Sequence, residues 1–223
     1  MAFDALGERI YLVDEKGDEI AVEQALLLYL ALLREGGRSG KVVLPATITS
    51  QAESMLDGSQ LEIERTVGSL AELTKAAAAE GVIFGGALGG GYVFPEFLPA
   101  YDATASLCKL LELLAPVERP LSELVAELPS STLVHRPLQC PWSMKGTVMR
   151  ALTERLRGRE VDLVDGIKVF DERGWAQVQP DPDEPLLHLY SEGRTEEESV
   201  DLEEELRRIV QEIMEGQEAV ARR

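Results

Sequence analysis

Residues 22–44 read V-E-Q-A-L-L-L-Y-L-A-L-L-R-E-G-G-R-S-G-K-V-V-L, and this stretch decides the fold class. Residues 22–33 are apolar on nearly every side, which predicts a helix that is deeply buried. The glycines at 36–40 end that helix, and residues 41–44 then form an apolar strand. A buried helix followed at once by a strand is typical of a crossover unit in a mostly parallel sheet, so the class is α/β.

The same alternation of strands and helices extends to both sides of this stretch, through about residue 115. The expected strands are 10–13, 41–44, 61–64, 82–84 and 92–94, and the expected helices are 22–33, 47–56, 69–80, 102–115 and 121–128. Asp102 is a plausible N-cap, because its carboxylate can accept from the first free N–H groups of a helix. We therefore expect residues 1–131 to form a three-layer α/β/α domain with a mixed, mostly parallel sheet.

A second domain is expected over residues 132–223, because turn residues cluster at Pro129-Ser130-Ser131 without apolar periodicity. Its expected elements are a strand at 133–138, a helix at 144–157, a hairpin at 167–178, a strand at 186–190 and a final helix. Thr195 and Glu198 have the spacing of a capping box at the start of that last helix. These elements indicate a smaller α+β domain.

Composition and charge exclude several classes of function. The formal net charge of −18 would repel a nucleic-acid backbone, whose binding depends on Lys and Arg. No apolar run approaches the roughly 18 residues of a membrane span, and no secretory signal precedes residue 10, so a cytoplasmic protein is expected. Ten acidic residues between Glu192 and Glu215 fit a solvated helix face.

Candidate chemistry is sparse when it is read from the residues alone. Asp4 and Glu8 could hold a hard cation such as Mg²⁺, or they could belong to a plain surface turn. Glycines at 85, 86, 89, 90 and 91 form either a ligand-binding loop or a flexible hairpin. The two histidines, His135 and His188, lie on expected strands without a nucleophile around them, and this favours a structural or surface role.

Three segments together resemble the α-D-phosphohexomutase family, enzymes that move a phosphate between positions 1 and 6 of hexoses. F-D-A-L-G-E-R at 3–9 is similar to the family's magnesium motif D-G-D-G-D-R. G-G-A-L-G-G-G at 85–91 is similar to the sugar-recognition motif G-G-E-x-S-G-H, and Q-P-D-P-D-E-P at 179–185 to the phosphate motif R-P-S-G-T-E-P. The resemblance implies the family's domains three and four, the latter with a fold like the TATA-box-binding protein.

The resemblance also implies that the working residues of all three loops are altered. In the metal loop, Asp4 matches the first aspartate, Glu8 replaces the third and Leu6 replaces the second, so Mg²⁺ binding is impaired. The sugar loop keeps Gly86, whereas Ala87, Gly89 and Gly91 replace Glu, Ser and His. The phosphate loop has Gln179 for Arg, and Asp181, Pro182 and Asp183 for Ser, Gly and Thr, and this exchanges phosphate donors for carboxylates. No catalytic residue is assigned.

C-P-W-S-M-K-G at 140–146 and Q-P-D-P-D-E-P look like the phosphomannomutase-like tail that some bacteria fuse behind a mannose-1-phosphate guanylyltransferase. The resulting hypothesis is a non-catalytic module for regulation, ligand sensing or assembly in GDP-mannose-type sugar-nucleotide synthesis. Its expected partners are an upstream nucleotidyltransferase or mutase domain of the same chain and a sugar phosphate. The alternatives are the C-terminal half of a divergent mutase, which needs a phosphoserine domain, and a module that forms homo-oligomers through its acidic last helix.

Overall fold

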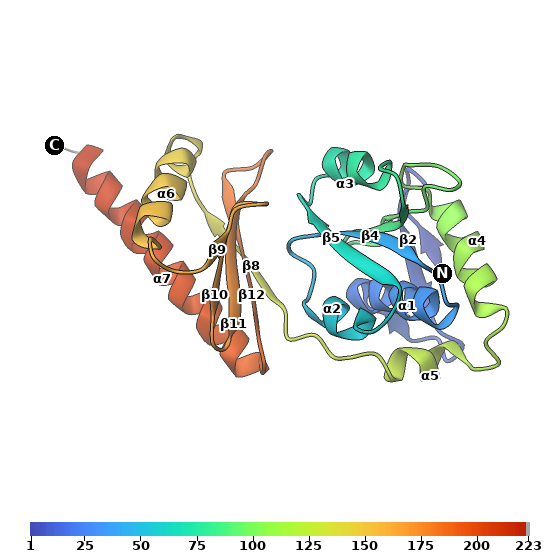
Figure 1. Cartoon of the computed structure of the whole chain (residues 1–223). Helices are drawn as coiled ribbons and strands as arrows, with labels where there is room; N and C mark the ends of the chain where they lie inside the picture. The colour runs from blue at the N-terminus through green and yellow to red at the C-terminus, as the bar shows by residue number, and fades with distance from the viewer. Residues whose placement is uncertain (222–223) are drawn as a thin grey trace. The chain divides into compact units, whose positions relative to one another are not determined.

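A computed structural model describes residues 1–221, which form an α/β chain of two compact units (Figure 1). The first unit is Met1–Ser130 and the second begins at Ser131. Each unit has its own buried apolar clusters. None of the described helices is both long and apolar enough to cross a membrane.

The main sheet of the first unit is mixed and mostly parallel, as the sequence predicts. It has the strand order β5-β4-β6-β7, in which β4 (Gly40–Pro45) runs parallel to β5 (Leu61–Thr66) and to β6 (Val82–Gly86). The short β7 (Tyr92–Val93) is antiparallel to β6. Because parallel strands need a crossover, the chain passes over a face of the sheet between β4 and β5 and again between β5 and β6.

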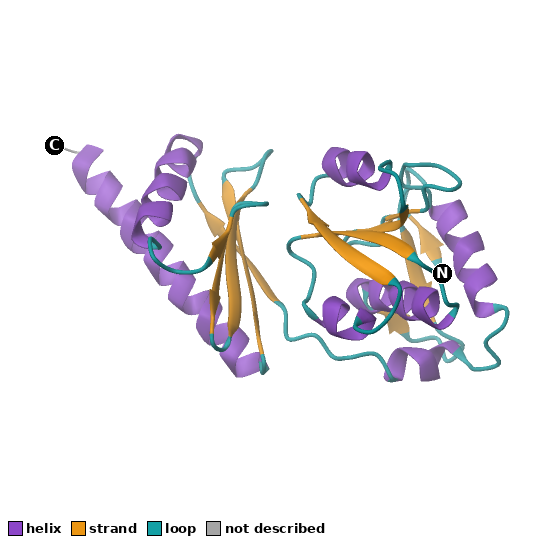
Figure 2. Ribbon diagram, in the orientation of Figure 1, coloured by secondary structure: helices purple, strands orange, loops and turns teal. Residues whose placement is uncertain are grey.

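Helices cover both faces of this sheet, which makes three layers (Figure 2). Val42 and Leu44 of β4 belong to the same apolar cluster as α1 (Val22–Glu35), whereas Val43 packs with α3 (Leu70–Ala77) on the other face. Successive residues of a strand point to opposite faces, so V-V-L without a polar residue is the pattern of a strand buried on both sides. The expectation of an α/β/α arrangement is confirmed.

A small antiparallel sheet and two more helices also belong to the first unit. The sheet contains β1 (Ala2–Phe3), β2 (Ile10–Val13) and β3 (Glu19–Ile20). The helices are α4 (Ala103–Leu114), capped by Asp102, and α5 (Leu121–Ala126). The Tyr29 hydroxyl of α1 donates to the Ser106 carbonyl of α4 over 2.8 Å, which satisfies a buried polar group and joins these two helices.

The second unit is an antiparallel sheet with the strand order β8-β12-β11-β10-β9. Its strands are β8 (Val134–Gln139), β9 (Val161–Asp162), β10 (Ile167–Asp171), β11 (Gly174–Pro180) and β12 (Leu186–Gly193). Within the described part of this unit, α6 (Trp142–Arg155) and α7 (Glu196–Ala221) lie on the same face of the sheet (Figures 1 and 2). Alternate strand residues therefore point away from the helices.

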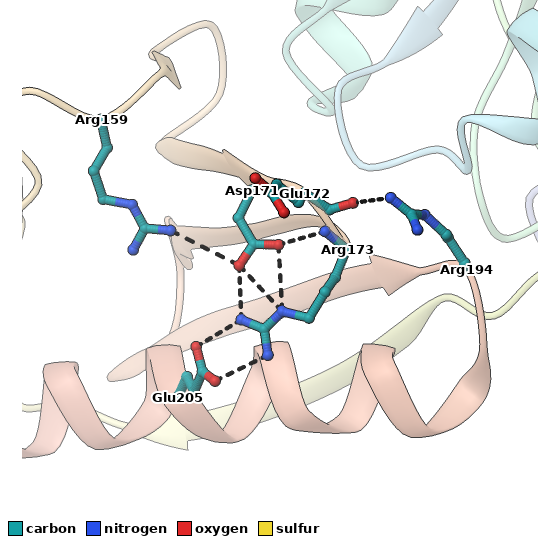
Figure 3. Close-up of polar contacts among 6 residues, drawn as sticks. All are labelled: Arg159, Asp171, Glu172, Arg173, Arg194 and Glu205. Carbon is teal, nitrogen blue, oxygen red and sulfur yellow. Dashed lines mark hydrogen bonds and ion pairs between the residues drawn. The ribbon is translucent and has the colours of Figure 1, made fainter.

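The tight turn between β10 and β11 is tied to α7 by an arginine (Figure 3). The Arg173 guanidinium contacts the Asp171 carboxylate at 2.7 Å and donates two hydrogen bonds to Glu205, at 3.0 and 2.9 Å. These bonds lower the pKa of both Asp171 and Glu205, because each carboxylate is held in its charged form. The hairpin and the helix are thus joined by charge as well as by apolar packing.

The structure differs from the predicted elements mainly at their ends. Helix α2 (Gln51–Leu56) begins four residues later than expected, because Arg65 donates to the carbonyls of Pro45, Ile48 and Thr49 and holds that segment as a loop. Helix α3 ends at Ala77 and continues as a turn up to residue 81. The two-residue strands β1, β3 and β9 are too short to give a sequence pattern.

Candidate functional site

Asp4 organises the first candidate loop, which joins β1 to β2. Its Oδ1 accepts hydrogen bonds from the backbone N–H groups of Glu8 and Arg9, at 2.8 and 3.1 Å. The bond from Arg9 is the main reason why the pKa of Asp4 is lowered. Leu6, between the two carboxylates, is 78% exposed and offers no ligand. Asp4 therefore stabilises the turn itself.

The carboxylates of this loop do not fit a bound Mg²⁺. Magnesium needs near-octahedral oxygen coordination, and here only Asp4 and Glu8 supply carboxylates, one of which already accepts two N–H groups. Among residues 1–221 there is no group of three or more His, Cys, Asp or Glu side chains that could hold a metal ion. We assign no magnesium-dependent step to this chain.

The glycine loop after β6 is packed rather than open. Gly90 has a φ of +83°, and a Cβ there would lie 2.4 Å from the Ile10 carbonyl oxygen. A Cβ at Gly91 would lie 2.8 Å from the Tyr101 ring. Ala87, where the resemblance expects a glutamate, is 9% exposed and belongs to the apolar cluster around Leu73. The Ile10 backbone explains Gly90 and the Tyr101 ring explains Gly91, since a side chain would not fit at either position.

The metal and glycine loops lie against each other. The Ile10 N–H donates to the Gly90 carbonyl over 2.9 Å, and Arg9 forms a β-bridge with Gly91. The Gly7 carbonyl accepts the Ala103 N–H at the start of α4, over 2.8 Å. The backbones of the two loops are thus held together at one candidate site, which we call the outline of the site. The side chains of Ala87, Gly89 and Gly91 bring no polar group to it.

Arg9 is the charged residue of this outline that sequence reasoning missed. It stands where the magnesium motif D-G-D-G-D-R has its arginine, so the resemblance contained the signal. Its side chain is exposed and, within the described residues, donates no hydrogen bond. A cation in this position can attract an anionic ligand toward the glycine loop.

In the segment 179–185 of the second unit, a carboxylate accepts hydrogen bonds from the backbone of the same segment. Asp181 Oδ1 accepts the backbone N–H groups of Asp183 and Glu184, both at 2.7 Å, and its Oδ2 lies 2.8 Å from His188 Nε2. The histidine is the main cause that lowers the pKa of Asp181 to about 2. Backbone N–H groups of this kind are the donors with which a loop holds a phosphate. Here a carboxylate of the same loop already uses them.

Two further contacts fix the ends of this segment. Gln179, in the place of the family's arginine, donates from Nε2 to Asp165 Oδ2 over 2.8 Å. The Lys145 ammonium donates to the carbonyls of Asp181 and Glu184, and lies 3.8 Å from the centre of the Trp142 ring. The ammonium therefore binds the backbone of the loop. The Asp183 side chain stays exposed.

Lys145 and Asp165 were not predicted as site residues. Lys145 belongs to the C-P-W-S-M-K-G string, which the resemblance singled out. The resemblance did not indicate which atoms the Lys145 ammonium contacts. Asp165 precedes β10 and comes close to Gln179 only because β11 pairs with β10, a register that spacing alone does not give.

A comparison with protein families matches residues 17–132 to the phosphoglucomutase/phosphomannomutase α/β/α domain III. The metal loop at 3–9 lies before this match. Among curated proteins, the chain is 31% identical over 221 residues to a probable phosphoglucosamine mutase of Methanopyrus kandleri, covering 96% of the chain and 49% of that protein. It is 27% identical to a phosphoglucomutase/phosphomannomutase of Thermococcus kodakarensis, covering 97% of the chain and 48% of the relative.

Solved structures show the same fold. A phosphoglucomutase/phosphomannomutase family protein of Burkholderia thailandensis superposes with a TM-score of 0.80 at 20% identity, covering 96% of this chain and 46% of the other. An N-acetylglucosamine-phosphate mutase in its substrate complex superposes with a TM-score of 0.66 at 13% identity, covering 94% and 48%. The chain thus spans about half the length of the relatives that it matches.

Proposed function

This chain belongs to the phosphoglucomutase/phosphomannomutase family, and from that premise we propose that it is a non-catalytic phosphohexomutase-like module. In this proposal residues 1–131 correspond to the family's domain three and residues 132–223 to its C-terminal domain. The module serves regulation, ligand sensing or assembly in a cytoplasmic sugar-nucleotide protein.

One observation carries the proposal: Asp181 occupies the phosphate donors of its own loop. The N–H groups of Asp183 and Glu184 point at a carboxylate held at 2.7 Å. An incoming phosphate would have to displace that carboxylate and then face the negative charges of Asp181 and Asp183 in a segment without arginine. Pro182 also removes one N–H group that a phosphate cradle could use.

The identity of the parent protein is the finer part of the proposal. The strings C-P-W-S-M-K-G and Q-P-D-P-D-E-P, which resemble the tail of a mannose-1-phosphate guanylyltransferase, contact each other. Lys145 of the first donates to two carbonyls of the second, and the Cys140 N–H donates to the Pro185 carbonyl over 2.8 Å. The two strings therefore form one packed segment, and it is their resemblance that supports a tail of that type, with a nucleotidyltransferase domain as its partner.

A turnover assay tests the proposal. We expect no mutase activity when the chain is combined with Mg²⁺, glucose 1,6-bisphosphate and mannose 1-phosphate, glucose 1-phosphate or glucosamine 1-phosphate. Because the chain spans half of its relatives, the assay is repeated with the N-terminal half of the Methanopyrus kandleri relative. The matched control is that same N-terminal half with its own C-terminal half. Turnover with our chain would contradict a non-catalytic module.

A second candidate is the C-terminal half of a divergent mutase. It is favoured by the retained contact between the metal and glycine loops, and by Arg9 beside Gly91. The gene sequence upstream of residue 1 distinguishes the divergent mutase from the non-catalytic module. A phosphoserine motif of the T-A-S-H-N-P type supports the divergent mutase, and a nucleotidyltransferase supports the non-catalytic module.

A further inference from the structure

The chain has two histidines in 223 residues, and the fold brings them together. His135 lies on β8 and His188 on β12, 53 positions apart, and His135 Nε2 is 3.0 Å from His188 Nδ1. In the register of these strands His188 faces Pro137 and Tyr190 faces His135, so both imidazoles lie on one face of the sheet as diagonal neighbours. Strand pairing, and not chain proximity, creates this pair.

The tautomers follow from the hydrogen bonds around the pair. Asp181 Oδ2 accepts from His188 Nε2 at 2.8 Å, so in the neutral ring the proton is on Nε2 and a lone pair is on Nδ1. The neutral His135 donates its Nε2–H to that lone pair. Burial and the neighbouring His188 lower the pKa of His135, which favours the neutral imidazole, the form that binds metals.

Two features hold the rings in place. The His135 ring stacks on Tyr190, with centroids 4.3 Å apart and planes 9° apart. His188 is held from its other side by Asp181, an arrangement of carboxylate and imidazole that typically fixes the orientation and tautomer of a metal-binding histidine. Each ring is therefore held by a contact besides the one between the two imidazoles.

The spacing of the two nitrogens matches one shared ion. With metal–nitrogen bonds of about 2.05 Å, two imidazole nitrogens lie about 2.9 Å apart at a right angle and about 3.4 Å apart at a tetrahedral angle. The observed 3.0 Å falls within this range, and each ring must turn so that its lone pair leaves the N···N line of the present hydrogen bond and points at the ion. Burial raises the pKa of the Tyr190 phenol to about 12, so that group stays neutral and is a poor ligand. Water would complete the coordination.

We propose that His135 Nε2 and His188 Nδ1 together bind one late first-row transition-metal ion, with Asp181 orienting His188. Imidazole nitrogen suits Zn²⁺, Cu²⁺ and Ni²⁺. On binding, the His135 proton moves from Nε2 to Nδ1, which leaves a lone pair on each coordinating nitrogen. The site involves the second unit alone and holds whether or not the chain takes part in sugar-phosphate chemistry.

Calorimetric titration of the full chain with Zn²⁺, Cu²⁺ and Ni²⁺ tests this site. We expect saturable binding of one ion per chain, weakened at least about tenfold by His135→Gln and by His188→Gln, and about tenfold by Asp181→Asn. Cys108→Ser removes an exposed thiol far from the pair in sequence and should leave binding unchanged. Circular dichroism verifies that each variant is folded.

Ring ¹⁵N spectra give a second readout, because only two imidazoles contribute. On adding Zn²⁺, Nε2 of His135 and Nδ1 of His188 should both shift, and the shifts should saturate at one equivalent. Binding that survives either histidine substitution, binding that is lost only with Cys108→Ser, or no saturable binding of any of the three ions would overturn the proposal.

Discussion

At the residue scale, Asp181 uses both of its carboxylate oxygens, one inside its own loop and the other on His188 of β12. Oδ1 accepts two backbone N–H groups and Oδ2 contacts His188. Carboxylates that accept several such bonds are strongly stabilised in the charged form. The carboxylate thus accepts backbone N–H groups of its own loop, and we propose that it does so in place of a phosphate.

The titration of Asp181 is the first prediction. Its pKa in the folded chain is about 2, below the value of an unpaired aspartate, so its hydrogen bonds stabilise the loop above about pH 4 and are lost as the pH falls through about 2. Carboxyl-carbon NMR should show this low midpoint, and the Asp183 and Glu184 amide shifts should follow it. A midpoint near the ordinary value would contradict the proposed contacts.

Gly90 gives a second prediction at this scale. Gly90→Ala forces both a positive φ and a Cβ 2.4 Å from the Ile10 carbonyl oxygen. Gly17→Ala is the matched control, because its φ is +94° and no atom lies within 4 Å of the added Cβ. We expect a loss of about 1 kcal/mol in unfolding free energy for the control and at least about 2 kcal/mol for Gly90→Ala. Urea denaturation measures both, and equal losses would show that the two loops are not packed together.

Resemblance assigned residues to the three candidate loops, and spacing alone assigned little; the roles of these residues stay predictions. Asp4, Ala87 and Gln179 could be aligned with motifs, and the structure shows what each of them contacts. The meeting of His135 and His188 could not be predicted, because it depends on the register of β8 against β12. Spacing within one chain does not encode that register.

At the element scale, Arg173 joins the β10–β11 turn to α7 (Figure 3). Arg173→Met should lower the unfolding free energy by about 1 kcal/mol, the range of a partly exposed ion pair. Arg150→Met, on the exposed side of α6, is the control and should be nearly neutral. Thermal denaturation compares the two variants at neutral pH.

The same contacts predict how the difference in unfolding free energy between wild type and Arg173→Met depends on pH. The pKa values of Asp171 and Glu205 are lowered by Arg173, so the stabilisation is fully present above their unfolded values near pH 4 and is lost as the pH falls through their folded values. The gap between wild type and Arg173→Met should therefore close in acid. A gap that persists at low pH would assign the loss to packing of the arginine stem.

Elements with strong periodicity could be predicted well from the sequence. The apolar stripe of α7 packs through Leu202, Leu206 and Val210, and the Asp102 cap of α4 accepts the Ala105 N–H over 2.8 Å. The start of α2 could not be predicted, because Arg65 on the next strand holds the preceding loop. Tertiary contacts of this kind override local propensity.

At the scale of the whole molecule, two folded units keep the family's architecture, and our proposal places the difference from the family in the loops. Apolar cores with fully buried Leu26, Val42 and Leu187 require only that side-chain size and pattern be kept. A functional loop instead requires particular donors at particular atoms. The fold can therefore persist after the site has changed, and this is why fold similarity alone does not assign an activity.

The central claim is that the 179–185 segment is closed to phosphate by its own Asp181. The most direct test is an NMR titration of the whole chain with glucose 1,6-bisphosphate, observing the amides of Asp183 and Glu184. A variant carrying Gln179→Arg, Asp181→Ser, Pro182→Gly and Asp183→Thr serves as the comparison. We expect no saturable shift in the wild type and a saturable shift in the variant. Saturable shifts of these amides in the wild type would contradict the claim.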